Sequence, residues 1–247
     1  MIAVVAEKTE LGTVLQGRWG TLGRVLQQAE SLPYRRSIQE FASTGLPEVD
    51  ALTGGLPRGA LTEIVGPASS GRTSLLLAIL AEATRRQEVC AVVDASNAFD
   101  PVAAAGSGVD LSRLLWVRCG GNPEHDPRRD VAEVQGHASE CVALDLGDIP
   151  PRVVRRIPLA CWFRLQRAVE NTPTMLVALE QVSCAPSCAS LVLEMKPQRL
   201  NWSGMPECSQ LLRGARFEAS PRKPMGSAAA AFQAQAIVLQ PRVVGEE

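Results

Sequence analysis

Eight residues decide the fold of this chain: Gly66-Pro67-Ala68-Ser69-Ser70-Gly71-Arg72-Thr73. They follow a short apolar run, Leu61 to Val65, that is typical of a buried strand, and they lead into a helical pattern over Thr73 to Arg86. A glycine-rich turn between a strand and a helix lets successive backbone N–H groups point inward at a phosphate, and the helix N-terminus adds partial positive charge. The stretch therefore predicts a phosphate-binding loop.

The consensus of such loops, G-x-x-x-x-G-K-[ST], is met everywhere except at the lysine, which is Arg72 here. Arg72 keeps the positive charge, but its guanidinium is longer and planar and is not a compact point charge. The Thr73 hydroxyl is expected to bind Mg²⁺. The alternative is a glycine-rich turn that holds no ligand. The predicted nucleotide-binding residues are Gly66, Pro67, Ala68, Ser69, Ser70, Gly71, Arg72, Thr73 and Ser74.

Further apolar runs on the C-terminal side alternate with helical patterns. This alternation predicts an α/β fold with a mostly parallel sheet flanked by helices. Two later runs have no long helix between them and predict an antiparallel extension of the sheet on the C-terminal side. The predicted strands are Leu61–Val65, Val89–Asp94, Leu114–Arg118, Cys141–Asp145, Thr174–Leu179, Ala189–Met195 and Ala215–Ala219, and the clearest later helix is Leu159–Glu170.

Three segments are predicted along the chain. Residues 1–40 form an N-terminal helix, Leu11 to Ser31, followed by a linker. Residues 41–220 form the α/β core. Residues 221–247 form a low-complexity segment and a C-terminal tail, of which 221–232 is expected to be mobile.

Composition excludes several classes of protein. The net charge of −1 gives no overall attraction to nucleic acid, so any such contact needs a local patch. No apolar run approaches the ~20 residues that span a bilayer, which predicts a cytoplasmic protein with no membrane contact. The seven cysteines are scattered and only two histidines are present, so no structural zinc is expected.

The stretch from Ser43-Thr44-Gly45 through Gly54-Gly55-Leu56-Pro57-Arg58-Gly59 and the phosphate-binding loop resembles bacterial RecA. So do Val92-Val93-Asp94-Ala95-Ser96-Asn97-Ala98-Phe99-Asp100-Pro101 and Gly108-Val109-Asp110-Leu111. The resemblance is dense from about 43 to 118 and thins beyond 141. The later part, with Arg164-Leu165-Gln166-Arg167-Ala168 and Leu211-Leu212-Arg213-Gly214-Ala215-Arg216-Phe217, looks more like the short RecA relatives called ImuA, which are accessory proteins of mutagenic translesion synthesis.

The RecA resemblance implies roles for three positions. Ser96 stands where RecA has the glutamate that polarises the attacking water, and a serine hydroxyl is a poor base. Asp145 takes the place of the Mg²⁺-binding aspartate, and Gln181 that of the γ-phosphate sensor. The alternatives are a strand-end aspartate that caps the next turn and a simple polar strand end. No catalytic residue is therefore assigned, and the resemblance implies ATP or ADP with Mg²⁺ as weakly bound cofactors.

RecA binds single-stranded DNA through two loops, the second of which follows the sensor glutamine. Only six residues, Val182 to Ser187, separate Gln181 from Cys188, so that loop has no room here. A basic cluster remains as a contact surface for DNA or a protein partner, the alternative being an ordinary solvated helix face. Its members are Arg152, Arg155, Arg156, Arg164 and Arg167.

Three functions stay open. The first is an ImuA-type accessory factor of the SOS response that contacts a translesion polymerase or RecA and hydrolyses ATP weakly or not at all. The second is an active DNA-dependent ATPase recombinase. The third is an interaction module that binds no nucleotide. Self-association through the N-terminal helix is also suggested by the resemblance.

Overall fold

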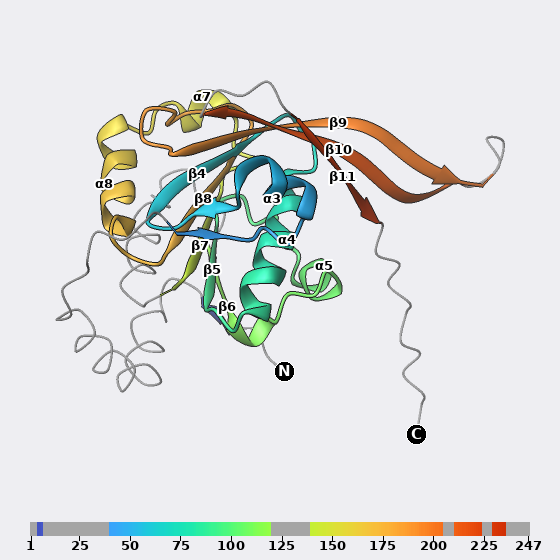
Figure 1. Cartoon of the computed structure of the whole chain (residues 1–247), viewed down its shortest axis with the longest axis horizontal. Coiled ribbons are helices and arrows are strands. Elements are labelled where there is room, and N and C mark those ends of the chain that lie inside the picture. The colour runs from blue at the N-terminus through green and yellow to red at the C-terminus, as the bar shows by residue number, and fades with distance from the viewer. Residues whose placement is uncertain (1–3, 7–39, 120–138, 205–209, 224–228, 236–247) are drawn as a thin grey trace.

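A computed structural model describes residues 4–6, 40–119, 139–204, 210–223 and 229–235 (Figure 1). Within them the chain forms a nine-stranded sheet in the order β1-β6-β5-β7-β8-β4-β9-β10-β11, beside a small ladder of β2 and β3. The elements are β1 (Val4–Ala6), β2 (Phe41–Ala42), α3 (Pro47–Thr53), β3 (Leu56–Pro57), β4 (Ala60–Val65), α4 (Arg72–Arg85), β5 (Cys90–Asp94), α5 (Pro101–Gly106), a 3-10 turn (Leu111–Arg113), β6 (Leu114–Arg118), β7 (Cys141–Asp145), α7 (Pro151–Val154), α8 (Leu159–Val169), β8 (Met175–Glu180), β9 (Leu191–Ser203), β10 (Leu211–Lys223) and β11 (Ala230–Gln235).

The strands from β1 to β9 in that order are parallel to their neighbours. Strands β10 and β11 continue the sheet in antiparallel pairing. Both parts of the fold prediction are therefore confirmed: a mostly parallel sheet with helices, and an antiparallel extension at the C-terminal side.

Two apolar cores lie on the two faces of the sheet. On one face the helix α4 contributes Leu75, Leu76 and Ile79. On the other face α8 contributes Trp162 and Leu165. The central strands β5 and β7 are buried along their whole length, because a parallel strand covered on both faces has no solvent side. This burial explains why their sequences are continuous apolar runs.

The central elements lie where the sequence predicts them, β6 and β7 to the residue and the others within a residue or two. The C-terminal strands differ more: β9 and β10 each span 13 residues, about twice the predicted length for β9 and more than twice that for β10. The expected mobile segment over 221–232 is wrong at both of its described ends, because β10 continues to Lys223 and β11 begins at Ala230. Strand β11 is held in place by its pairing with β10. The rings of Phe217 and Phe232, whose centroids are 5.7 Å apart, add a contact between the two strands.

Some predictions are not tested by these elements. The predicted N-terminal helix and the tail beyond 235 lie outside the described residues, and the segment boundaries at 40 and 220 stay predictions. Among the described helices, none is both long enough and apolar enough to cross a bilayer.

The distal halves of β9 and β10 form an arm that extends away from the rest of the sheet (Figure 1). Strand β4 pairs with β9 only as far as Glu194, and β11 pairs with β10 only from Gly214 onward. Leu200, Trp202 and Leu211 on the arm are about half exposed. The proximal halves pack on the core through Met195 and Phe217, so the arm is anchored beside α4.

Candidate functional site: the phosphate-binding loop and the edge of the sheet

The predicted phosphate-binding loop lies at the carboxyl end of β4, the edge where open α/β sheets bind ligands. The Gly66 N–H donates to the carbonyl of Glu180 at 3.2 Å, which ties the loop to the end of β8. Helix α4 begins at Arg72, and the first helical bond runs from the Leu75 N–H to the Gly71 carbonyl at 2.9 Å. Between these anchors the N–H groups of Ser69 and Gly71 donate to no acceptor among the described residues. The loop therefore offers free donors at a helix N-terminus, a geometry that fits a phosphate group.

Two glycines of the loop have no room for a side chain. A Cβ on Gly66 would lie 2.5 Å from the carbonyl oxygen of Met195. Gly71 has a φ of +88°, and a Cβ there would lie 2.4 Å from a ring carbon of Phe217. Phe217 lies on β10, far along the chain, so no local pattern could have predicted this contact. The loop shape thus depends on both glycines and on the antiparallel extension.

Arg72 is buried, with 7% of its surface exposed. Its Nη1 and Nη2 each donate at 3.3 Å to the carbonyl of Gly147, just beyond the end of β7. Burial lowers the pKa of Arg72, and the charges of Asp145 and Asp148 partly oppose this. The residue in the position of the loop lysine therefore connects the loop to the neighbouring strand end.

The carboxylate of Asp145 lies at the same place. It is the last residue of β7, and its Oδ1 accepts the Gly147 N–H at 2.9 Å. Burial raises its pKa, as do the charges of Asp94 and Asp148, whereas the Gly147 N–H and Arg72 act in the opposite direction. The hydrogen bond from Gly147 matches the strand-end capping role that the sequence left open for Asp145.

Gln181 Nε2 donates to the Gly147 carbonyl at 3.1 Å, so it joins Arg72 on one acceptor. The structure thus brings together Arg72, Asp145 and Gln181, which the sequence singled out separately. Gly147 itself was not predicted, because a backbone carbonyl carries no side-chain signal. Thr73 is exposed in the first turn of α4.

Ser96 follows β5 at the same edge of the sheet, and its Oγ is buried without a hydrogen-bond partner among the described residues. The neighbouring Asp94 is fully engaged: its carboxylate accepts the N–H groups of Ala98 and Phe99 and the Trp116 Nε1–H. Neither side chain is thus arranged as a base that activates water.

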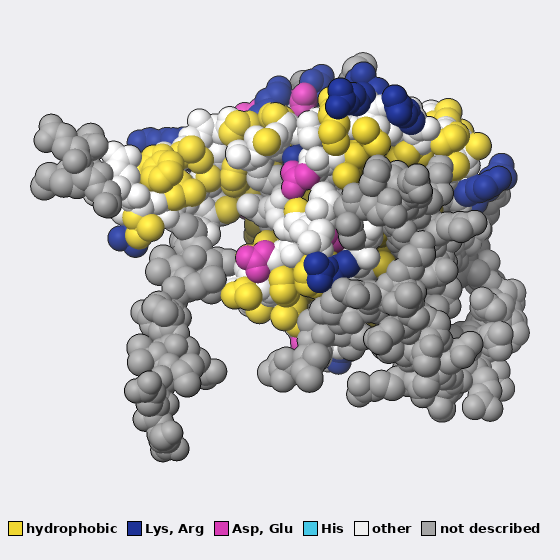
Figure 2. Space-filling view, turned by 180° about the vertical axis from the view of Figure 1, so that it is seen from behind, with side chains coloured by type: hydrophobic (Ala, Val, Ile, Leu, Met, Phe, Trp, Pro, Cys, Tyr) yellow, Lys and Arg dark blue, Asp and Glu magenta, His cyan; other side chains and the backbone are white. Residues whose placement is uncertain are grey.

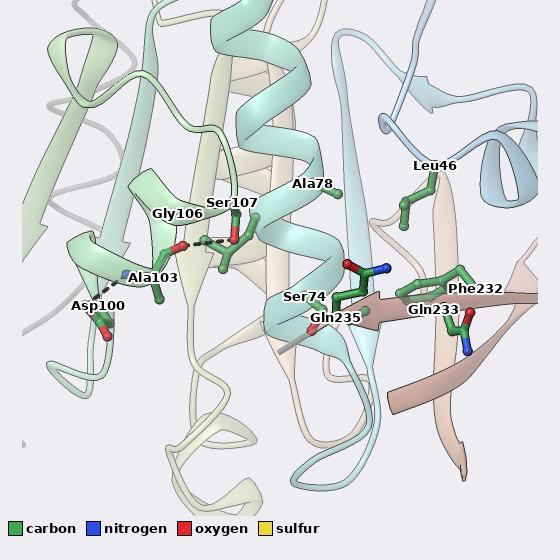
Figure 3. Close-up of a pocket in the computed structure, with 12 residues that line it drawn as sticks. Leu46, Ser74, Ala78, Asp100, Ala103, Gly106, Ser107, Phe232, Gln233 and Gln235 are labelled. Atoms are coloured by element: carbon green, nitrogen blue, oxygen red, sulfur yellow. Dashed lines mark hydrogen bonds between the residues drawn. The ribbon is translucent and has the colours of Figure 1, made fainter. Parts of the chain in front are cut away.

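A pocket of about 760 Å³ adjoins the loop along α4 (Figure 3). Ser74 and Ala78 of α4 form one wall, and Asp100 and Ser107 at the ends of α5 form another. Gln233 and Gln235 of β11 and the side chain of Leu46 complete it. Asp100 Oδ1 accepts the Val102 N–H at 2.8 Å as the N-cap of α5, which holds its carboxylate at the rim. Apolar walls with a few polar groups beside a phosphate-binding loop suit the base and sugar of a nucleotide.

Two buried carboxyl groups that the sequence did not single out as a pair lie behind the loop, on the face that α8 covers. Glu63 of β4 accepts hydrogen bonds from the Ser183 hydroxyl at 2.7 Å and from the N–H groups of Cys184 at 2.9 Å and Ala185 at 2.7 Å. Glu180 of β8 accepts the Cys184 N–H at 3.0 Å, and burial beside Glu63 raises its pKa to about 8. This pair fixes the connection that follows Gln181 and does not face the pocket along α4.

The five predicted arginines, Arg152, Arg155, Arg156, Arg164 and Arg167, are all exposed on α7, on α8 and between them. They form no salt bridge with another described residue. Val153, Leu159 and Phe163 are exposed on the same helices. Figure 2 shows basic and apolar side chains next to each other over these helices, so the surface is a mixed basic and apolar patch.

Comparison with known proteins agrees with this architecture. Residues 22–125 match the family RecA N-terminal domain. Protein RecA of Rhizobium leguminosarum bv. viciae is 34% identical over 158 residues, which cover 58% of this chain and 45% of the relative. Protein RecA of Rhizobium leguminosarum bv. trifolii (strain WSM2304) is 51% identical over 159 residues, 58% of this chain and 44% of the relative. The chain thus spans less than half the length of these curated relatives. By this similarity and by its sheet topology, the chain resembles proteins of the bacterial RecA family.

Proposed function

We propose that this chain is a nucleotide-binding DNA-repair protein of the RecA type that acts as an ImuA-like accessory factor of translesion synthesis in the SOS response. In this function ATP or ADP stabilises a conformation or an assembly, and hydrolysis is weak or absent. The observation that carries the proposal is the loop from Gly66 to Ser74, whose free N–H donors lie at the N-terminus of α4 beside a nucleoside-sized pocket. The similarity to the bacterial RecA family supports a role in DNA repair.

The residues around the loop favour binding over turnover. The position that calls for a water-activating carboxylate holds Ser96, and Glu180 lies on the opposite face with its carboxyl group next to Glu63. Arg72, which takes the position of the loop lysine, donates to the Gly147 carbonyl. Thr73 and Asp145 remain the residues predicted from the sequence as Mg²⁺ ligands, and Gln181 the predicted sensor of the γ-phosphate.

Millimolar ATP or ADP is expected to raise the melting temperature by about 3–6 °C, since a ligand that binds only the folded state at roughly ten times its Kd adds ~1.4 kcal/mol. Phosphate release from ATP should stay near the protein-free background, with or without single-stranded DNA. Adenosine is the control, because it lacks the phosphates that the loop would hold and should leave the melting temperature unchanged. Absence of any shift with ATP and ADP would favour the interaction module that binds no nucleotide. Rapid DNA-stimulated phosphate release would favour the active recombinase.

Binding of single-stranded DNA is the second candidate function, and the short connection between β8 and β9 argues against tight binding. Between β8 and β9 only residues 181–190 connect the strands, and several of them are held by Glu63. A connection this short and this firmly bonded leaves no loop to follow a DNA strand, so we expect DNA binding to be weak and free of sequence preference. Contact with a protein, such as a translesion polymerase or RecA itself, is better supported, because the arginine patch includes exposed apolar side chains.

Charge reversal at Arg164 and Arg167 is expected to weaken partner or DNA capture without unfolding the protein. Both side chains are exposed on α8, three residues apart, and exposed charges contribute at most ~1 kcal/mol to stability. The measurement is a pull-down from DNA-damaged cells, with salt-dependent DNA binding in parallel. Arg199→Glu with Arg213→Glu is the matched control, because it makes the same change of net charge on the exposed arm. Identical captured partners for both double variants would remove the α7–α8 patch from the proposal.

A further inference from the structure

The guanidinium of Arg72 is a fixed internal cation. It is buried, and both of its terminal nitrogens donate to the carbonyl of Gly147. Gln181 donates to the same carbonyl, which closes the other side. A planar group held by two donors on one acceptor has little freedom to swing. The positive charge is thus positioned before any ligand arrives.

The surroundings of this cation are acidic. Asp94 and Asp145 end the adjacent strands β5 and β7 and are paired in register. Asp148 follows shortly after, and its charge and that of Asp145 act on Arg72. The Asp145 carboxylate is buried and accepts the Gly147 N–H at 2.9 Å. Arg72 and Asp145 therefore both contact Gly147 at this acidic strand edge.

The guanidinium and the Asp145 carboxylate border the same small space. A Cβ built on Gly147 would lie 3.0 Å from Asp145 Oδ1 and 3.3 Å from Arg72 Nη1. A magnesium ion bound to Asp145 would enter this buried space, where its charge would meet the guanidinium with little solvent screening. Magnesium also requires near-octahedral coordination and keeps several of its waters. The residues here therefore fit the phosphates of a nucleotide but do not fit the metal ion while Arg72 holds this position.

We propose that Arg72 replaces the magnesium ion in this site, so that ATP and ADP bind with an affinity that does not depend on a divalent cation. The inference rests on nucleotide binding at the loop from Gly66 to Ser74. It replaces the sequence-based assignment of Thr73 and Asp145 as Mg²⁺ ligands. In this arrangement the negative charge of Asp145 balances the positive charge of the Arg72 guanidinium. The phosphate oxygens are then neutralised by the loop N–H groups and by Arg72.

The test compares the Kd of ATP and of ADP in excess magnesium and in EDTA, at matched ionic strength, by titration calorimetry. For the unmodified chain the Kd in magnesium and the Kd in EDTA should agree within about twofold, because the cation that neutralises the phosphates is part of the protein. The matched variant is Arg72→Lys, whose compact ammonium has no paired donors for Gly147 and leaves space beside Asp145. Its affinity is expected to become about tenfold or more tighter in magnesium than in EDTA.

Each outcome is decisive. A tenfold gain from magnesium in the unmodified chain would overturn the inference and leave nucleotide binding intact. An Arg72→Lys variant that is as insensitive to magnesium as the unmodified chain would also overturn it, because the arginine would then not be the cause. Absence of measurable nucleotide binding by the unmodified chain in both conditions would overturn the proposed function itself, and this inference with it.

Discussion

Glu180→Gln is expected to stabilise the protein strongly at alkaline pH and little at acid pH. The pKa of Glu180 is raised from 4.5 to about 8 by burial and by the charge of Glu63, so the folded state keeps a proton that the unfolded chain releases. The free energy of unfolding should therefore fall as the pH rises from about 4.5 to about 8, by up to ~1.4 kcal/mol per pH unit. A glutamine carries its own donor toward Glu63 and keeps an acceptor for the Cys184 N–H, so at pH 8 the gain should be on the order of 3 kcal/mol.

Urea unfolding of both proteins between pH 5 and pH 8.5 measures this effect. Glu180 Oε1 has no donor among the described residues, as expected of a group whose hydrogen bond depends on its own proton. The control is Glu170→Gln, the same change at an exposed position beside α8, which should alter stability by less than about 0.5 kcal/mol at every pH. A pH profile of Glu180→Gln that runs parallel to that of the unmodified protein would contradict the assignment.

Gly71→Ala is expected to destabilise the protein by more than its backbone conformation alone explains. At a φ of +88° an alanine costs roughly 1–2 kcal/mol, and its Cβ would also lie 2.4 Å from the ring of Phe217. Overpacking of this kind adds about 1–3 kcal/mol, because the ring and strand β10 must move. Nucleotide binding should be lost as well, since the methyl group and the shifted loop disturb the N–H donors.

Gly54→Ala separates the two costs. Gly54 has a φ of +76°, and a Cβ there would meet nothing within 4 Å, so only the conformational cost of ~1–2 kcal/mol applies. Denaturant unfolding of both variants gives the difference between the costs. Equal losses of stability for the two variants would mean that Phe217 does not restrain the loop. In the double variant with Phe217→Ala, the non-additive part of the free energy measures the contact directly.

The sequence predicted well those elements whose cause is local. The strand at Cys141–Asp145 and the helix at α4 follow from apolar runs and helical spacing, and the turn between Gly66 and Thr73 follows from glycine chemistry. It predicted β9 and β10 too short, because apolar and polar residues alternate little along their distal halves, which are mostly exposed. It missed β11 because an alanine-rich segment has no strand signal apart from its partner. It also missed β1, a three-residue strand whose order depends on pairing with β6.

The sequence by itself determined the fold class, the position of the loop and the absence of a carboxylate at Ser96, since each depends on residues next to one another in the chain. The tertiary structure alone decided what these residues contact. Arg72 meets Gly147, Gly71 meets Phe217 and Glu63 meets Glu180, each pair separated by at least 75 residues. Such pairings arise because sheet order places distant strand ends side by side, and burial then fixes their charges and hydrogen bonds. Local periodicity contains no information about which distant segment will become the neighbour.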